Sequence, residues 1–346
     1  MSIQKQFDKF HDNIKLTRED KAYKEAREKD DSIKSDIKSA FKDAGYPVTE
    51  DFIQGSMADG VNTGVISLHG DRDIDRALVI DSDKSPDDPT APKKVLRDTL
   101  KKRGFSDPRI KKPCVTANYV SSDLHFDYPI YSKDSCGNLE LAVGKEFSQE
   151  DSKKWDDSDP KGLIDHLKDE NGDLTSLEKS QYRRIARYLK RWRDFRYTDD
   201  TERKKVYSIG LTLMAKDSFS KQVNEDGVPN DLLALRETIS NVLYTKGYFS
   251  LTDLENDKYK ISVSLPVSPW RDIFDGHGSS VGTPLRKKLI KLLEKCDLAL
   301  VEENVVEQSK ILRKQFGDDF PLAEKKDSVK KNIYVGGGLV GDPSGA

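Results

Sequence analysis

The chain has 346 residues, a length that fits about two domains, and 35% of them are hydrophobic. It carries 59 Lys and Arg against 61 Asp and Glu, for a formal net charge of −2. Its apolar runs, such as residues 298–301, are far shorter than the roughly 18–20 residues that cross a membrane. The composition therefore excludes a membrane-spanning helix and a uniformly basic nucleic-acid binder, so any phosphate binding must come from locally segregated charge.

The first half of the chain predicts a helical start followed by strands and loops. Phe7, Phe10 and Ile14 recur at helical spacing, and Gly45-Tyr46-Pro47 ends this region. The acidic stretch 151–160 predicts a crossing between two lobes. In chain order we expect helix within 1–45, a glycine-punctuated segment over 51–64, a strand over 73–80, a helix near 92–103, and strands around 113–120, 122–131 and 138–143.

The second half of the chain predicts mainly helices. Residues 176–196 carry an apolar stripe at helical spacing that includes Tyr182 and Leu189. Thr175 and Glu178 form a capping box at its start. Further helices are expected near 207–216, 229–245 and 283–315, with a strand over 259–266.

The cysteines and the N-terminus indicate the compartment. Cys114, Cys136 and Cys296 are widely spaced, odd in number and outside any CxxC motif. This pattern predicts neither a disulfide framework nor a zinc site. The sequence begins with polar residues rather than an apolar signal segment. We therefore expect a cytoplasmic protein.

Three aspartates form the strongest chemical signal. Asp73 and Asp75 are two residues apart on a predicted strand, so their side chains share one face while Ile74 turns into the core. Asp71 offers a competing pair with Asp73, but only the first register puts an apolar residue between the carboxylates. An alternating stretch around Asp127 puts a third carboxylate on a neighbouring strand. Mg²⁺ prefers such oxygen ligands, so we expect a two-metal site for phosphoryl transfer.

A glycine and a serine supply the other half of this site. Gly55 lets the backbone approach a phosphate closely, and Ser56 offers a hydroxyl and an amide where a helix would start. Gly-Ser and Asp-x-Asp pairs each occur by chance, so the prediction depends on the three parts together.

The second signal is basic. Residues 181–205 carry ten Lys and Arg against four acidic residues, a local net charge of +6. Most of these side chains fit a solvent-exposed helix face. Lys190 lies at the edge of the apolar stripe, where it would reach a phosphate. The arginines alternatively predict a surface for nucleic acid.

The motifs together resemble a known family. Residues 54–56, 73–75 and 125–131 resemble the polymerase-β-like nucleotidyltransferases. Residues 155–161 and 182–194 resemble the bacterial CD-NTases more specifically. Those enzymes are relatives of cyclic GMP-AMP synthase and oligoadenylate synthetase, and they make nucleotide second messengers in CBASS anti-phage defence. The resemblance covers most of residues 50–322.

The resemblance implies a bilobal α/β (α+β) fold. A catalytic lobe with a mixed sheet is expected over residues 1–160, including an N-terminal helix. A mainly helical second lobe over 161–322 completes the nucleotide cleft. Residues 323–346 are expected to form a flexible tail.

The resemblance also implies the chemistry. Asp73, Asp75 and Asp127 would bind two Mg²⁺ ions, or Mn²⁺ in their place, with Asp127 taking the proton of the attacking hydroxyl. The other residues implied, as contacts of the donor NTP, are Gln54, Gly55, Ser56, Lys190 and Ser208. The substrates would be ATP, GTP or both, the product a cyclic di- or trinucleotide that reaches a downstream effector, and nucleic acid would not be required. The long span from Ser56 to Asp73 departs from the shorter loop of many relatives and leaves its geometry open.

The tail suggests a partner. In some CBASS systems a ubiquitin-transfer-like protein joins the synthase through its last residue to another molecule. A flexible tail that ends at Ala346 would suit such a reaction, although an ordinary frayed terminus looks the same in sequence.

Two alternatives stay open. The first is a different polymerase-β-like nucleotidyltransferase, which makes a linear oligonucleotide or acts on a tRNA end or a small molecule. The second is a non-catalytic RNA-binding module that uses the 181–205 stretch.

Overall fold

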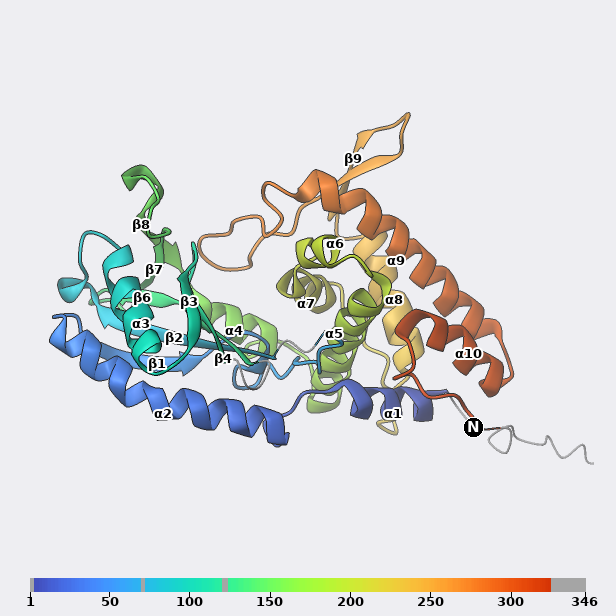
Figure 1. Cartoon of the computed structure of the whole chain (residues 1–346). Coiled ribbons are helices and arrows are strands. Elements are labelled where there is room, and N and C mark those ends of the chain that lie inside the picture. Colours follow the sequence, from blue (N-terminus) through green and yellow to red (C-terminus); the bar gives the residue numbers. More distant parts are fainter. Residues whose placement is uncertain (1–2, 70–71, 120–123, 325–346) are drawn as a thin grey trace, which may run out of the picture.

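The computed structural model describes residues 3–69, 72–119 and 124–324, and it has two lobes (Figure 1). One lobe, here the sheet lobe, contains an eight-stranded mixed sheet. The other, here the helical lobe, is built mainly from helices around one large apolar core. The predicted fold class, a mixed α/β sheet lobe followed by a mainly helical lobe, is confirmed. The tail from residue 325 to Ala346 lies outside the described residues.

Seven strands of the sheet follow the order β3-β4-β5-β2-β6-β7-β8, and the eighth, β1, pairs with β2. The strands are β1 (Val48–Ile53), β2 (Arg72–Asp81), β3 (Ser106–Ile110), β4 (Val115–Tyr119), β5 (Leu124–Tyr128), β6 (Ile130–Lys133), β7 (Leu139–Val143) and β8 (Lys154–Ser158). Helices α2 (Lys21–Asp43) and α3 (Thr90–Lys102) pack against this sheet and against each other.

β8 lies within the acidic stretch 151–160, which was expected to cross between lobes. Residues 154–158 form an edge strand antiparallel to β7, and the chain then passes to α4 (Pro160–Lys168), which packs on the core of the helical lobe. Trp155 of β8 packs against the core of the sheet lobe and donates to Pro86 O at 2.9 Å. An edge strand tolerates exposed carboxylates, and charged side chains there prevent pairing with another chain. This polar stretch therefore includes an edge strand that the sequence did not predict.

β2 is the centre of the sheet lobe. It runs parallel to β5 through its first residues and parallel to β6 through its last ones, and it is antiparallel to β1. Ile74, Leu78 and Ile80 point into the larger core, whereas Ala77 and Val79 belong to a second cluster on the other face. This alternation follows from the two-residue period of a strand.

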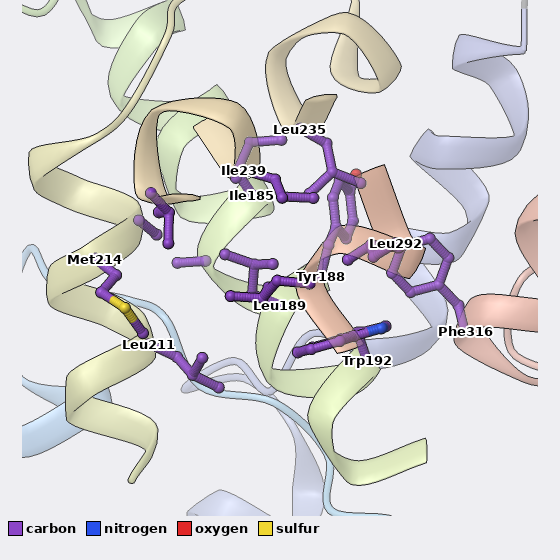
Figure 2. Packing of buried hydrophobic residues seen from close by; sticks show 14 of the residues in the cluster. Ile185, Tyr188, Leu189, Trp192, Leu211, Met214, Leu235, Ile239, Leu292 and Phe316 are labelled. Carbon is purple, nitrogen blue, oxygen red and sulfur yellow. The ribbon is translucent and has the colours of Figure 1, made fainter. Parts of the chain in front are cut away.

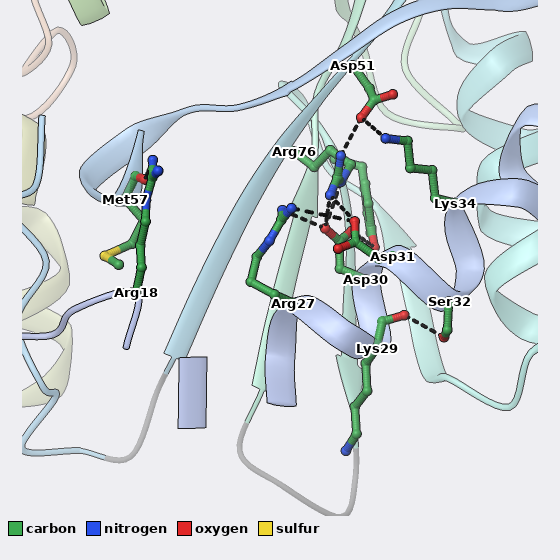
Figure 3. Close-up of polar contacts among 11 residues, drawn as sticks. Arg18, Arg27, Lys29, Asp30, Asp31, Ser32, Lys34, Asp51, Met57 and Arg76 are labelled. Atoms are coloured by element: carbon green, nitrogen blue, oxygen red, sulfur yellow. Dashed lines mark hydrogen bonds and ion pairs between the residues drawn. The ribbon is translucent and has the colours of Figure 1, made fainter. Parts of the chain in front are cut away.

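Arg76, next to Asp75 on β2, ties the strand to α2 and β1 (Figure 3). Its side chain is buried and donates through Nε to Asp30 Oδ2 at 2.7 Å. It also forms ion pairs with Asp31 and Asp51. Tyr128 donates to the other oxygen of Asp30 at 3.0 Å. The network fixes the strand that carries the predicted aspartates.

The N-terminal helical region is divided between the lobes. It breaks into α1 (Gln4–Ile14) and α2, with residues 15–20 between them. Phe7 and Phe10 of α1 pack against Tyr188 in the helical lobe, with ring centroids 5.3 and 5.1 Å away. α2 packs on the sheet instead. The boundaries at residues 160 and 322 stay predictions.

The helical lobe surrounds α5, which the sequence predicted together with its capping box (Figure 2). Tyr188, Leu189 and Trp192 of α5 are buried in the core. The helices of this lobe are α4 (Pro160–Lys168), α5 (Ser176–Arg196), α6 (Asp200–Lys205), α7 (Ser208–Asp217), α8 (Asp231–Tyr244), α9 (Gly278–Val301) and α10 (Val305–Phe316). The strands β9 (Phe249–Asp253) and β10 (Lys258–Ile261) form a hairpin.

Two predictions for this lobe needed adjustment. The helix expected over 283–315 is two helices, α9 and α10, and the strand expected over 259–266 ends at Ile261. Within the described residues, no helix is both long enough and apolar enough to cross a bilayer.

Candidate active site

Two neighbouring strands bring two of the predicted aspartates together. β2 and β5 are parallel, and their register pairs Asp75 with Asp127 and Asp73 with His125. Asp73 lies two residues before Asp75, a spacing that puts both on one face of the strand. The side chain of Asp73 is outside the described part of the structure. The strand register therefore places Asp75 beside Asp127, and the full three-carboxylate cluster stays a prediction.

Asp127 lies in a polar, partly buried environment. Its Oδ1 accepts from Cys114 Sγ at 3.4 Å and lies 3.5 Å from His125 Nε2. Burial raises the pKa of Asp127, but the hydrogen bond and charge of His125, together with Lys111, lower it below its ordinary value. Asp127 is therefore an ionised carboxylate at neutral pH.

Gly55 brings the loop after β1 against Asp75. A short 3₁₀ turn, η1 (Gly55–Met57), follows β1, and Gln54 N donates to Asp75 O at 2.9 Å. Gly55 has a φ of +70°, and a Cβ at this position would overlap the Asp75 carboxylate. Only glycine permits both the backbone conformation and this close approach. The predicted phosphate-binding turn and Asp75 consequently form one site.

A cavity of about 460 Å³ opens at this point between the lobes. Its volume lies in the range of small-molecule sites. Gly55, Ser56 and Asp75 line it from the sheet lobe, and Lys190 and Ser208 line it from the helical lobe. Gly55 and Lys190, which are 135 positions apart and were predicted from separate motifs, therefore line the same cavity.

Lys190 reaches the cavity from α5. Its side chain is buried, and its Nζ donates to Thr63 O at 2.9 Å and to Thr63 Oγ1 at 3.1 Å. Burial, with the nearby charges of Arg187 and Arg193, lowers the pKa of Lys190 to about 7. Because both hydrogen-bond acceptors are neutral oxygens, the ammonium charge remains available to an anion in the cavity.

Ser208 opens α7 at the far wall of the cavity. Its hydroxyl accepts from Arg193 Nη1 at 2.7 Å, and Arg193 itself lines the cavity. Sequence reasoning did not single out Arg193, because its spacing on α5 does not distinguish it from the other basic residues of that helix. The pairing with Ser208 depends on how α7 packs against α5.

Gln54 has a different position from the other predicted contacts. Its side-chain oxygen accepts from Tyr131 Oη at 3.1 Å, and it is not among the described residues that line the cavity. Gln54 therefore holds the turn against β6, and its contact with a nucleotide stays a prediction.

Four basic side chains of α5 hold the segment 60–66, the part of the long loop whose geometry the sequence left open. Arg183 donates to Gly60 O (2.6 Å), Lys190 to Thr63 O (2.9 Å), Arg187 to Gly64 O (3.0 Å) and Arg191 to Ile66 O (2.7 Å). The prediction of a solvent-exposed helix face is wrong for the three arginines, since Arg187 and Arg191 are buried, Arg183 is half-buried and all three bind carbonyls. Burial also removes them from any flat surface for nucleic acid.

The donor set of the site fits a hard cation. Asp75 and Asp127 offer carboxylate oxygens from adjacent strands, and divalent cations such as Mg²⁺ prefer such ligands. Among the side chains that the structure describes, no three His, Cys, Asp or Glu form a metal-binding group. The side chain of Asp73 lies outside that set, so a two-ion site stays a prediction.

Comparison with models of protein families finds no match. Comparison with solved structures finds proteins that share the architecture over most of the chain. The CD-NTase CdnG from Bradyrhizobium diazoefficiens, solved with GTP, superposes with a TM-score of 0.64 at 16% identity over 92% of this chain and 97% of that one. CdnC from E. coli MS115-1, solved with ATP, gives 0.62 at 19% identity over 92% and 98%.

A third similar structure is the cyclic AMP-GMP synthase DncV from Vibrio cholerae, described as a prokaryotic cGAS homolog. Its TM-score is 0.57 at 18% identity, over 93% of this chain and 82% of that chain. The chain has the CD-NTase fold. At such identities the likeness concerns the fold, and the activity is argued below from the site.

Proposed function

We propose that this protein is a metal-dependent nucleotidyltransferase that joins NTPs into a cyclic oligonucleotide. The observation that carries the proposal is the cavity between the lobes, where Gly55, Ser56 and Asp75 face Lys190 and Ser208. The fold supports it, since CD-NTases of this architecture have been solved with ATP and with GTP. A cyclic di- or trinucleotide is the product we propose, and a role in CBASS anti-phage defence follows from the same resemblance.

In this reaction the enzyme holds the donor NTP by its triphosphate. Ser56 offers its hydroxyl, and Gly55, which has no Cβ, lets the Asp75 carboxylate lie against the turn that binds the phosphates. Lys190 and Ser208 contact the triphosphate from the helical lobe. Clamping a phosphate chain between two lobes fixes the α-phosphorus for attack, and such positioning supplies most of the catalysis in phosphoryl transfer.

Asp73, Asp75 and Asp127 would hold the two Mg²⁺ ions, which supply charge stabilisation for the attacking and leaving oxygens. Asp127 accepts the proton of the attacking ribose hydroxyl, since its lowered pKa keeps it ionised. A bond then forms between that hydroxyl oxygen and the α-phosphorus, and the bond to the β-phosphate oxygen breaks. Pyrophosphate leaves, and a second round closes the ring.

The proposal is tested with all four NTPs, Mg²⁺ and product mass spectrometry. We expect cyclic products without any added acceptor, and the double variant Asp73→Asn plus Asp75→Asn to lower NTP consumption by at least about a thousandfold. The matched control is Asp83→Asn plus Asp87→Asn, which also removes two charges, at exposed positions after β2. Retained turnover in the first variant contradicts the site.

The same assay separates the alternatives. A linear product, or a requirement for a tRNA or small-molecule acceptor, would indicate another nucleotidyltransferase of this superfamily. RNA binding without any NTP turnover, unaffected by the aspartate variants, would indicate the RNA-binding module.

A further inference from the structure

A second cavity, here the basic groove, lies beside α5 on the other side of the segment 60–66. Its volume is about 400 Å³, enough for a small phosphorylated ligand. Six of its lining residues are basic: His11, Lys15, Arg18, Arg183, Arg184 and Arg187. None of the described residues that line it is acidic. In a chain with a net charge of −2, this is a marked local segregation of charge.

Some of these charges are already neutralised. Arg184 forms a two-point ion pair with buried Asp231, with distances of 2.6 and 2.8 Å. Lys15 pairs with Asp12 at 2.6 Å and Arg18 with Asp59 at 3.0 Å. These two pairs are largely exposed, and exposed ion pairs bind only weakly. A ligand with higher charge density can therefore take Lys15 and Arg18 from them.

Arg183 and Arg187 lack such partners. Arg183 donates to Gly60 O, and its Nε is buried without a hydrogen-bond acceptor in the described part of the chain. Arg187 donates to Gly64 O at 3.0 Å, and its Nη1 lies 3.1 Å from His11 Nε2. No ion pair joins either guanidinium to a carboxylate among the residues that the structure describes. Buried Arg187 and half-buried Arg183 thus leave an uncompensated positive charge.

Neighbouring groups respond to this charge. Burial, followed by Arg187 and Arg184, lowers the pKa of His11 to about 4, which leaves that imidazole neutral. Burial and then Arg183 lower the pKa of Arg187 to about 10. Burial is the larger cause of both shifts, and the neighbouring arginines add to it with the same sign.

The segment 60–66 separates the basic groove from the cavity of the candidate active site. Val61, Thr63 and Val65 line the active-site cavity, whereas Asn62 between them lines the basic groove. Arg183 and Arg187, which line the groove, also hold carbonyls of this segment. Each guanidinium therefore contacts both the basic groove and the segment that lines the active-site cavity.

We propose that the basic groove is a second anion site, which binds a small oligophosphate through Arg183, Arg187, Lys15 and Arg18. The ligand is an oligophosphate because the groove combines several guanidinium and ammonium donors, which match phosphate oxygens. Its source is either a free inorganic oligophosphate or the phosphates of a nucleotide. Occupancy of the groove orders the segment 60–66 and so changes the affinity of the active-site cavity.

The first test measures the binding of inorganic triphosphate by calorimetry in Mg²⁺-free buffer. We expect one binding event in the groove whose affinity Arg183→Gln lowers about tenfold or more, since hydrogen bonds to charged groups are strong. This binding event is called the groove component. The double variant Lys15→Gln plus Arg18→Gln should weaken the same component at little cost to folding, since the ion pairs that it removes are largely exposed. Arg196→Gln is the matched control, because Arg196 is on the same helix but lines neither cavity.

The results for the basic groove can be told apart from the results that test the proposed function. Ser208→Ala should weaken only binding in the active-site cavity, so it separates the two components. Failure of NTP turnover leaves the groove component in place. Triphosphate binding that the groove variants leave unchanged, or that Arg196→Gln weakens equally, overturns the proposal. Repeating the titration with ATP identifies the source: tighter groove binding of ATP indicates a nucleotide, and equal binding indicates phosphate alone.

The second test follows hydrogen exchange at the backbone amides of the segment 60–66. Triphosphate should slow exchange there in the wild type and in Ser208→Ala, but not in Lys15→Gln plus Arg18→Gln. Exchange that triphosphate does not change overturns the coupling between the groove and the active site.

Discussion

Two groups of basic side chains in this protein, both at least half-buried, have different hydrogen-bond partners. Arg76 on β2 is surrounded by the carboxylates of Asp30, Asp31 and Asp51. Arg183 and Arg187 on α5 bind backbone carbonyls instead, without a carboxylate pair among the described residues. Both arrangements satisfy hydrogen bonds, but only the first cancels the charge.

The difference separates structural charge from charge that is available to ligands. A buried guanidinium with carboxylate partners is useful only to the fold, since any anion would compete with those partners. A guanidinium that holds carbonyl dipoles keeps a positive potential around it. The anion-binding chemistry that we propose for the two cavities thus belongs to α5, and the rigidity of the aspartate strand belongs to the network of Arg76.

The largest effect on stability should follow removal of Arg76. Arg76→Met leaves Asp30, whose side chain is fully buried, without its main partner, and breaking a buried pair in this way costs about 3–5 kcal/mol. Denaturant unfolding, followed by circular dichroism, measures the free energy of unfolding.

The control for Arg76 is Arg103→Met. Arg103 follows α3 and pairs at 2.9 Å with Asp36, which is on α2 like Asp30. Both side chains of this pair are more than 40% exposed. Exposed pairs contribute about 0–1 kcal/mol, so this variant should remain close to the wild type. Equal destabilisation by the two substitutions would show that the Arg76 network does not differ from a surface pair.

A second comparison uses two neighbours on α5. Arg184→Met strands the buried carboxylate of Asp231 and should destabilise by about 2–3 kcal/mol, less than Arg76→Met because Tyr188 and Gln181 also donate to Asp231. Arg187→Met leaves only carbonyl and imidazole acceptors behind and also removes an uncompensated charge, so the cost should be about 1 kcal/mol. The same measurement of unfolding free energy compares the two variants. A larger loss of stability for Arg187→Met than for Arg184→Met would contradict the difference between carboxylate-paired and carbonyl-bound arginines.

Much of the fold was predictable because hydrophobic periodicity and capping are local signals. α5 begins at the capping box of Thr175 and Glu178, where the sequence placed it. β8 was missed because an edge strand needs few apolar residues, so its acidic pattern resembles a linker. The break between α1 and α2 was missed because both helices are amphipathic and differ only in the lobe that each one covers.

The candidate site was predictable where spacing alone determines geometry. The register of β2 and β5 follows from alternation in the two strands, and Gly55 stands where a close approach requires it. Arg193 beside Ser208, and the carbonyls that α5 holds in the segment 60–66, could not be predicted. These contacts join residues more than 100 positions apart or depend on the packing of two helices, and no local pattern encodes them.

The last effect that we expect concerns Lys190, and it is a pH dependence of nucleotide binding. Burial lowers the pKa of free Lys190 to about 7, and a bound triphosphate favours the ammonium form. Below pH 7 the charged form is already present, whereas above it binding must include proton uptake. The affinity for a non-hydrolysable ATP analogue should therefore fall by up to about tenfold between pH 7 and pH 8.5. Lys190→Met should bind more weakly at pH 7 and show no such slope, and parallel slopes in the two proteins would place the charge that holds the triphosphate elsewhere.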